Sequence, residues 1–141
     1  MKRLLITLTA LALSAGCGGQ EGPPVVVTDV VVTAPGAGMP MAAGYLKISN
    51  QSGGDIRITR VSSPEYGSVE MHETVIEDGI ARMRAIPALE IANGETVAFE
   101  RGGKHLMLMQ PVGEPRTITL NFYSGDELLL SVSADFTASM E

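Results

Sequence analysis

Two histidines and three methionines lie on two short segments, and their side chains are the best suited in this sequence to hold a metal ion. His72 and Met83 have ten residues between them, and His105, Met107 and Met109 follow further along the chain. Thioether sulfur is a soft, neutral donor that suits Cu(I), whereas Zn(II) favours thiolate, imidazole or carboxylate and Ca(II) favours oxygen. A set of two imidazoles and two thioethers therefore predicts a site for one Cu(I) ion per chain.

A hairpin is expected to bring the first two of these side chains together. The dipeptide Asp78-Gly79 is typical of a two-residue β-turn. With this turn, His72 pairs with Ala85 and Met83 pairs with Thr74, and all four side chains share one face of the hairpin. His72 and Met83 are then diagonal neighbours, about 7–8 Å apart, which two long side chains can span to reach one ion.

The second segment is expected to be an extended strand with two different faces. Side chains alternate along a strand, so His105, Met107 and Met109 point one way while Leu106 and Leu108 point the other. We expect the leucines to enter the core and the other three side chains to line an outer face. His105 and Met107 then supply two further ligands, and Met109 is a candidate accessory ligand.

The remaining methionines have other interpretations. Methionine is most often a filler of hydrophobic cores, and Met71 falls on the face opposite His72, which favours core packing. Met39 and Met41 flank a proline, and this pattern fits either a flexible arm that captures metal or a loop packed over the domain. Met140 belongs to the C-terminal tail.

The first 16 residues are typical of an export signal. A basic start is followed by the apolar run Leu4–Leu13, which is too short to span a bilayer because about 20 residues are needed. Small residues then precede Cys17, a pattern that resembles the lipobox of bacterial lipoproteins, in which the cysteine carries the lipid. We predict a signal peptide over 1–16, a lipidated Cys17 with a flexible tether over 17–24, a copper-binding domain over 25–136 and a tail over 137–141.

Removal of such a signal leaves an acidic chain with no free thiol. The 125 residues from Cys17 onward carry eight basic and 16 acidic residues, a formal net charge of −8. This balance argues against nucleic-acid partners, so we expect membrane contact through the lipid alone. Because Cys17 is the only cysteine and lipidation uses its thiol, disulfides, thiolate metal sites and a blue-copper centre are excluded for a lipidated chain. Gly18 after the lipidated residue favours the outer over the inner membrane.

Short segments rich in Val, Ile, Thr and Leu recur between turn signals after residue 24. We expect about nine short strands and hence an all-β domain, a Greek-key barrel or sandwich. The predicted strands are Val25–Val32, Tyr45–Ser49, Ile56–Val61, Val69–Val75, Ile80–Ile86, Thr96–Phe99, His105–Met109, Thr117–Tyr123 and Glu127–Ala134.

The order of the four proposed ligands, with gaps of ten, twenty-one and one residues, resembles the ligand motif of the periplasmic copper chaperones called PCuAC. The neighbouring residues Val69–Glu73, Gly102–Met109 and Ala43–Asn50 are also similar to that family. The resemblance implies a cupredoxin-like barrel, Cu(I) held by the four ligands, and a location on the periplasmic side of the cell envelope. It further implies delivery of copper to a subunit of cytochrome c oxidase or to a Sco-type assembly factor.

Two other functions fit the same residues. A copper buffer or resistance protein would bind the same ion without a dedicated acceptor. A structural lipoprotein would use these methionines and histidines only for packing, and substitution of His105 would then change stability without changing copper binding. An enzyme is not expected, because protein side chains fill every ligand position and no general base or open coordination site is evident.

Overall fold

Eleven β-strands and no helix make up the part of the chain that the computed structural model describes, residues 24–35 and 39–137. No helix there has the length and apolar character to cross a membrane. The predicted signal peptide, Cys17, most of the tether and Met140 lie outside the described residues. The strands are β1 (Val25–Thr33), β2 (Met41–Asn50), β3 (Ile56–Ile58), β4 (Arg60–Ser62), β5 (Tyr66–Glu77), β6 (Ile80–Ala85), β7 (Leu89–Ile91), β8 (Thr96–Phe99), β9 (Lys104–Pro111), β10 (Thr117–Ser124) and β11 (Glu127–Thr137).

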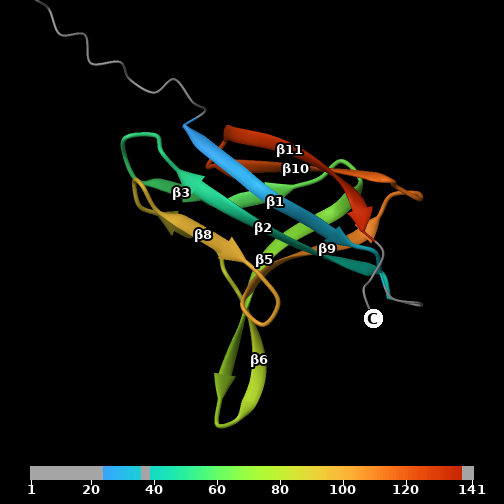
Figure 1. Cartoon of the computed structure of the whole chain (residues 1–141). Helices are drawn as coiled ribbons and strands as arrows, with labels where there is room; N and C mark the ends of the chain where they lie inside the picture. Colours follow the sequence, from blue (N-terminus) through green and yellow to red (C-terminus); the bar gives the residue numbers. More distant parts are fainter. Residues whose placement is uncertain (1–23, 36–38, 138–141) are drawn as a thin grey trace, which may run out of the picture.

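Seven of the strands close into a barrel (Figure 1). Their order is β1-β11-β10-β4-β5-β9-β2, and β2 pairs with β1 to close the ring. β1 and β11 run parallel, whereas the other neighbours in the ring are antiparallel. β8 extends the sheet beside β2, and β3 and β7 form a separate two-stranded sheet. The predicted all-β class is confirmed.

The core lies inside the barrel and is built from alternate positions of its strands. Leu106 and Leu108 of β9 and Leu120 and Phe122 of β10 are fully buried. Every second residue of these strands therefore faces inward, as the alternating sequence pattern predicts. Met71 of β5 is also buried, with 5% exposure, which confirms its predicted place in the core.

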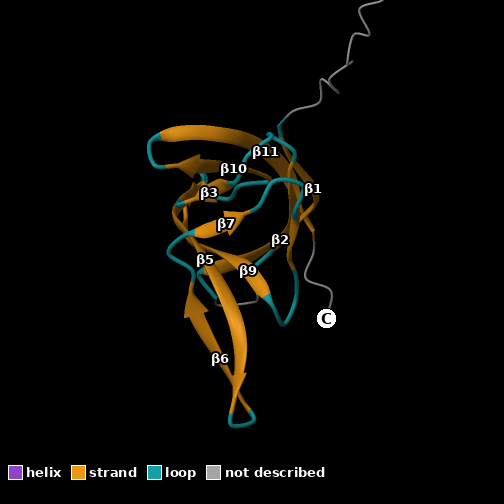
Figure 2. Ribbon diagram, turned by 90° about the vertical axis from the view of Figure 1, so that its left-hand side faces the viewer, coloured by secondary structure: helices purple, strands orange, loops and turns teal. Residues whose placement is uncertain are grey.

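The β5–β6 hairpin stands out from the barrel (Figures 1 and 2). Its turn is Asp78-Gly79, whose φ angles of 52° and 76° are the positive values that a two-residue Asp-Gly turn favours. His72 pairs with Ala85 and Thr74 pairs with Met83, so the predicted register is confirmed. Every residue of β6 is exposed, and this strand therefore contributes little to the core.

Some of the predicted strand limits are wrong. The predicted strand 56–61 is two strands, because β3 pairs with β7 whereas β4 pairs with β5 and β10. Between them the Thr59 N–H donates to the Tyr123 carbonyl oxygen at 2.9 Å, outside either strand. The three-residue β7 was not predicted, because one short pairing with a distant segment gives no local periodicity. β2 begins at Met41 rather than at Tyr45, which extends it along β9.

Glu65 fixes the turn that precedes β5. Its carboxylate accepts hydrogen bonds from the Ser63 hydroxyl at 2.8 Å and from the Thr119 N–H of β10 at 2.9 Å. Burial by itself raises the pKa of this carboxyl group, but the hydrogen bonds from Thr119 and Ser63 outweigh it and hold the pKa below its usual range. The charged carboxylate therefore stabilises the fold at neutral pH, and this contribution is lost as the pH falls through the lowered pKa.

Candidate metal centre

The predicted ligands lie on two neighbouring strands and on the hairpin that extends one of them. β5 and β9 are antiparallel, and His72 is directly opposite His105 in their register. Directly paired residues share a face of the sheet, so both histidines and Met107 lie on the face opposite the buried leucines of β9. Met107 and Met109 are partly buried. His105 is only 8% exposed, which is more buried than its predicted place on an outer face implies.

Each imidazole has one nitrogen engaged and one nitrogen free. His105 Nδ1 donates to the carbonyl oxygen of Gly103 at 3.1 Å, which leaves the lone pair of Nε2 available. His72 Nε2 donates to a carboxylate oxygen of Glu70 at 2.9 Å, and its Nδ1 is buried without any hydrogen-bond partner. The two ring centroids are 6.0 Å apart and the planes are tilted by 31°. Two imidazoles this close, each held by a backbone or carboxylate oxygen, have the arrangement typical of metal ligands.

A pocket of about 470 Å³ opens beside this pair, and Met83, His105 and Met107 line it. Met83 comes from the protruding hairpin and is 56% exposed. His72 is not among the lining residues and adjoins the pocket through its pairing with His105. Three of the four predicted ligands therefore line one pocket, and the fourth lies next to it.

Two further methionines line the same pocket, Met39 and Met41. The sequence left their role open between a capture arm and a packed loop. The only local signal was a methionine on each side of a proline. The position of Met41 at the site depends on the long-range pairing of β2 with β9, which that signal does not predict. In that pairing Met41 lies opposite Met109, although Met109 itself is not among the residues that line the pocket.

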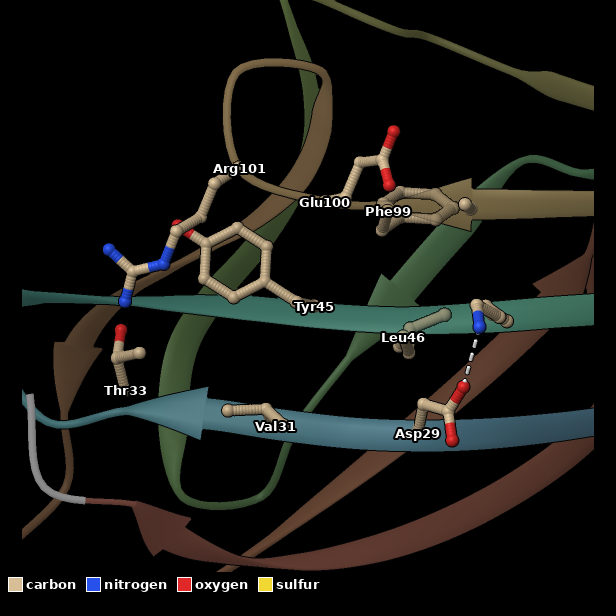
Figure 3. A pocket seen from close by; sticks show the side chains of 10 residues that line it. Asp29, Val31, Thr33, Tyr45, Leu46, Phe99, Glu100 and Arg101 are labelled. Atoms are coloured by element: carbon tan, nitrogen blue, oxygen red, sulfur yellow. Dashed lines mark ion pairs between the residues drawn. The ribbon is translucent and has the colours of Figure 1, made fainter. Parts of the chain in front are cut away.

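Neutral groups dominate the pocket. Arg101 is the one charged residue among those described that line it, and its guanidinium carbon lies 5.5 Å from the centroid of the Tyr45 ring. Figure 3 shows these two side chains next to each other in an adjoining groove of about 370 Å³, which they also line. No group of three or more His, Cys, Asp or Glu side chains that could hold a metal occurs within residues 24–35 and 39–137.

Residues 25–136 match the model of a protein family described as "Putative lipoprotein LpqE-like". The chain belongs to this family. A relative from Leifsonia xyli subsp. xyli, "Putative lipoprotein Lxx21020", is 31% identical, and the match covers 98% of this chain and 89% of the relative.

Solved structures similar to this LpqE-like chain include PCuAC domains and the protein DR1885. The Cu(I) form of DR1885 from Deinococcus radiodurans has a TM-score of 0.63 and 28% identity, over 89% of this chain and 85% of that one. The copper-bound PCuAC domain of PmoF2 has a TM-score of 0.60 and 20% identity, over 82% and 92% of the two chains. These likenesses confirm the cupredoxin-like fold and the family resemblance predicted from the sequence.

Proposed function

We propose that the protein binds one Cu(I) ion through His72, Met83, His105 and Met107 and hands it to another protein outside the cytoplasm. The observation that carries this proposal is the direct pairing of His72 with His105, each with a free ring nitrogen, beside a pocket lined by Met83 and Met107. Two thioethers with two imidazoles form a neutral, soft donor set, which favours Cu(I) over Zn(II), Ca(II) and Mg(II). The copper-bound structural neighbours support the same assignment.

Exposure of the ligands suggests the order of release. Met83 is 56% exposed on the hairpin, whereas His105 is 8% exposed. A thiolate or imidazole of the acceptor therefore reaches the ion from the Met83 side. Its bond to copper forms as the Met83 sulfur–copper bond breaks, and the remaining ligands exchange in turn. Copper stays Cu(I) throughout, so the transfer requires no oxidant or reductant.

The location and the acceptor are part of the same proposal. Cys17 carries a lipid that anchors the domain to the cell envelope, and the Gly- and Pro-rich tether over 17–24 lets the domain move away from the membrane surface. The lipoprotein family of the chain supports this anchor. The acceptor is a subunit of cytochrome c oxidase or a Sco-type assembly factor.

A copper titration followed by a transfer assay tests the proposal. The chain from Gly18 onward is titrated with Cu(I) under reducing conditions against a competing chromophoric chelator. We expect one tightly held copper per chain. The loaded protein is then mixed with an acceptor domain and separated from it, and copper should appear on the acceptor. Failure to compete with the chelator would overturn copper binding, whereas full retention of copper would leave a buffer and overturn delivery.

Glu70 should matter for copper affinity although it is not a ligand. Its hydrogen bond to His72 Nε2 fixes the ring and leaves Nδ1 for the metal. Loss of such a partner weakens metal binding by about 10- to 100-fold, so Glu70→Ala should show this loss in the same titration. Glu73→Ala is the matched control. The Glu73 carboxylate lies 4.0 Å from the Lys104 Nζ atom and has no hydrogen bond to the His72 ring nitrogens. Equal affinities for the two variants would contradict the role of Glu70.

A further inference from the structure

A second pair of methionines shares the pocket with the proposed ligands. Met39 and Met41 line it together with Met107. Met41 is paired across the strands with Met109 while Met107 is paired with Ala43, so Met41 and Met107 are diagonal neighbours about 7–8 Å apart. Methionine side chains are long and unbranched, and two of them can close such a gap around one ion.

Packing in the core does not account for this pair. Met39 is 62% exposed, and Met41 is partly buried at the first position of β2. Burial stabilises an apolar side chain in proportion to the area removed from water, so Met39 gains little in this way. Met71 shows the contrast, because it is 5% exposed and lies among the core residues.

The pair is also surplus to the site already proposed. His72, Met83, His105 and Met107 supply four donors, which complete a tetrahedral shell. Two more thioethers in the same pocket, together with Met107, therefore offer a second, sulfur-only set of ligands for the same soft ion. Because this set contains no imidazole, we expect it to hold the ion less firmly than the histidine-containing site does. Weak binding at this set allows the ion to move on to the histidine-containing site.

We propose that Met39 and Met41, with Met107 as a shared ligand, form an entry site where Cu(I) first binds before it moves to the histidine-containing site. This inference rests on the proposed copper function. In the transfer step the bonds from copper to the Met39 and Met41 sulfurs break as bonds to the two imidazole nitrogens and to the Met83 sulfur form, and Met107 stays bound. The ion remains Cu(I) throughout, so the step requires no oxidant or reductant.

The first test removes the histidine site and looks for what is left. In the variant His72→Ala, His105→Ala, binding of Ag(I), a redox-inert substitute for Cu(I), is followed by NMR of the methionine methyl groups. We expect weaker binding than in the unmodified protein, with shifts of the Met39, Met41 and Met107 methyl signals. Addition of Met39→Leu and Met41→Leu should remove that binding. Residual binding that survives these two substitutions would overturn the entry site.

The second test keeps all four proposed ligands and measures the rate of loading from a Cu(I)–chelator complex. Met39→Leu, Met41→Leu should load about tenfold more slowly, within the range over which association rates vary among variants of one binding surface. The Met71→Leu variant is the control, because it also replaces a thioether by leucine but lies in the core. Loading at the unmodified rate would overturn the inference while leaving the proposed function intact. An unmodified protein that binds no copper would overturn the proposed function itself.

Discussion

Replacement of Met83 and Met107 by leucine in the chain from Gly18 onward should lower the affinity for Cu(I) by at least about 100-fold. Loss of a residue that only hydrogen-bonds to a metal ligand already lowers metal affinity by about 10- to 100-fold. Of the four proposed ligands of the tight site, only the two imidazoles then remain. Leucine has nearly the volume of methionine and costs less than about 1.5 kcal/mol at a packed position, so the barrel should remain folded. The measurement is competition with a chromophoric chelator under reducing conditions, together with circular dichroism as a check on the fold.

Met71 provides the matched control for that double variant. It precedes His72 directly, yet its side chain is 5% exposed and lies in the core on the other face of β5. Met71→Leu therefore removes a thioether next to the site in sequence without removing one from the pocket, and its copper affinity should equal that of the unmodified protein. If the double variant also keeps the full affinity, the methionines of the pocket are packing residues. If Met71→Leu loses affinity, the assignment of faces is wrong.

Local sequence patterns were sufficient for the parts of the fold that local interactions determine. The Asp78-Gly79 turn set the register of the β5–β6 hairpin, because only a few backbone geometries close a two-residue loop and Asp-Gly adopts one of them. Alternation along β9 predicted which side chains enter the core, since Leu106 and Leu108 are fully buried. The same reasoning could not find β7, because its two buried apolar residues, Leu89 and Ile91, form a strand only by pairing with β3.

The sequence predicts a set of ligands for the candidate site, but it does not predict how the strands that carry them pair. Spacing indicated that two segments should converge, but the pairing of His72 with His105 depends on the register of β5 against β9, which no local turn determines. The place of Met41 likewise depends on the pairing of β2 with β9, across more than sixty residues of chain. The hydrogen bond from His72 to Glu70 was not predicted, because these two residues on one strand face meet only in one orientation of the His72 ring.

Asn50 at the end of β2 should be the most sensitive polar position of the barrel. Its side chain has no exposed surface, and its amide nitrogen donates to the carbonyl oxygens of Ile91 at 2.9 Å and of Gly54 at 2.8 Å. Its amide oxygen accepts from the Ser52 N–H at 3.0 Å and from the Ser52 hydroxyl at 2.7 Å. One side chain thus joins β2 to the following turn and to β7. Asn50→Ala should lower the free energy of unfolding by about 3 kcal/mol, because a buried polar group left without its partner costs about 1–3 kcal/mol.

Two companion variants separate hydrogen bonding from other effects of the change. Ser49→Ala, at the residue before Asn50, removes an exposed hydrogen bond between the Ser49 and Thr96 hydroxyl groups. It should lower the free energy of unfolding by less than about 1 kcal/mol, since water replaces the lost partner. Asn50→Asp keeps the shape but points a carboxylate at two carbonyl oxygens, which raises the pKa of the new carboxyl group in the folded state. The loss of unfolding free energy in Asn50→Asp should therefore become smaller as the pH falls toward that pKa, because the protonated carboxyl group can donate one of the lost hydrogen bonds. Urea unfolding at two pH values measures all three, and equal losses for Ser49→Ala and Asn50→Ala would show that the buried amide network does not hold this end of the barrel together.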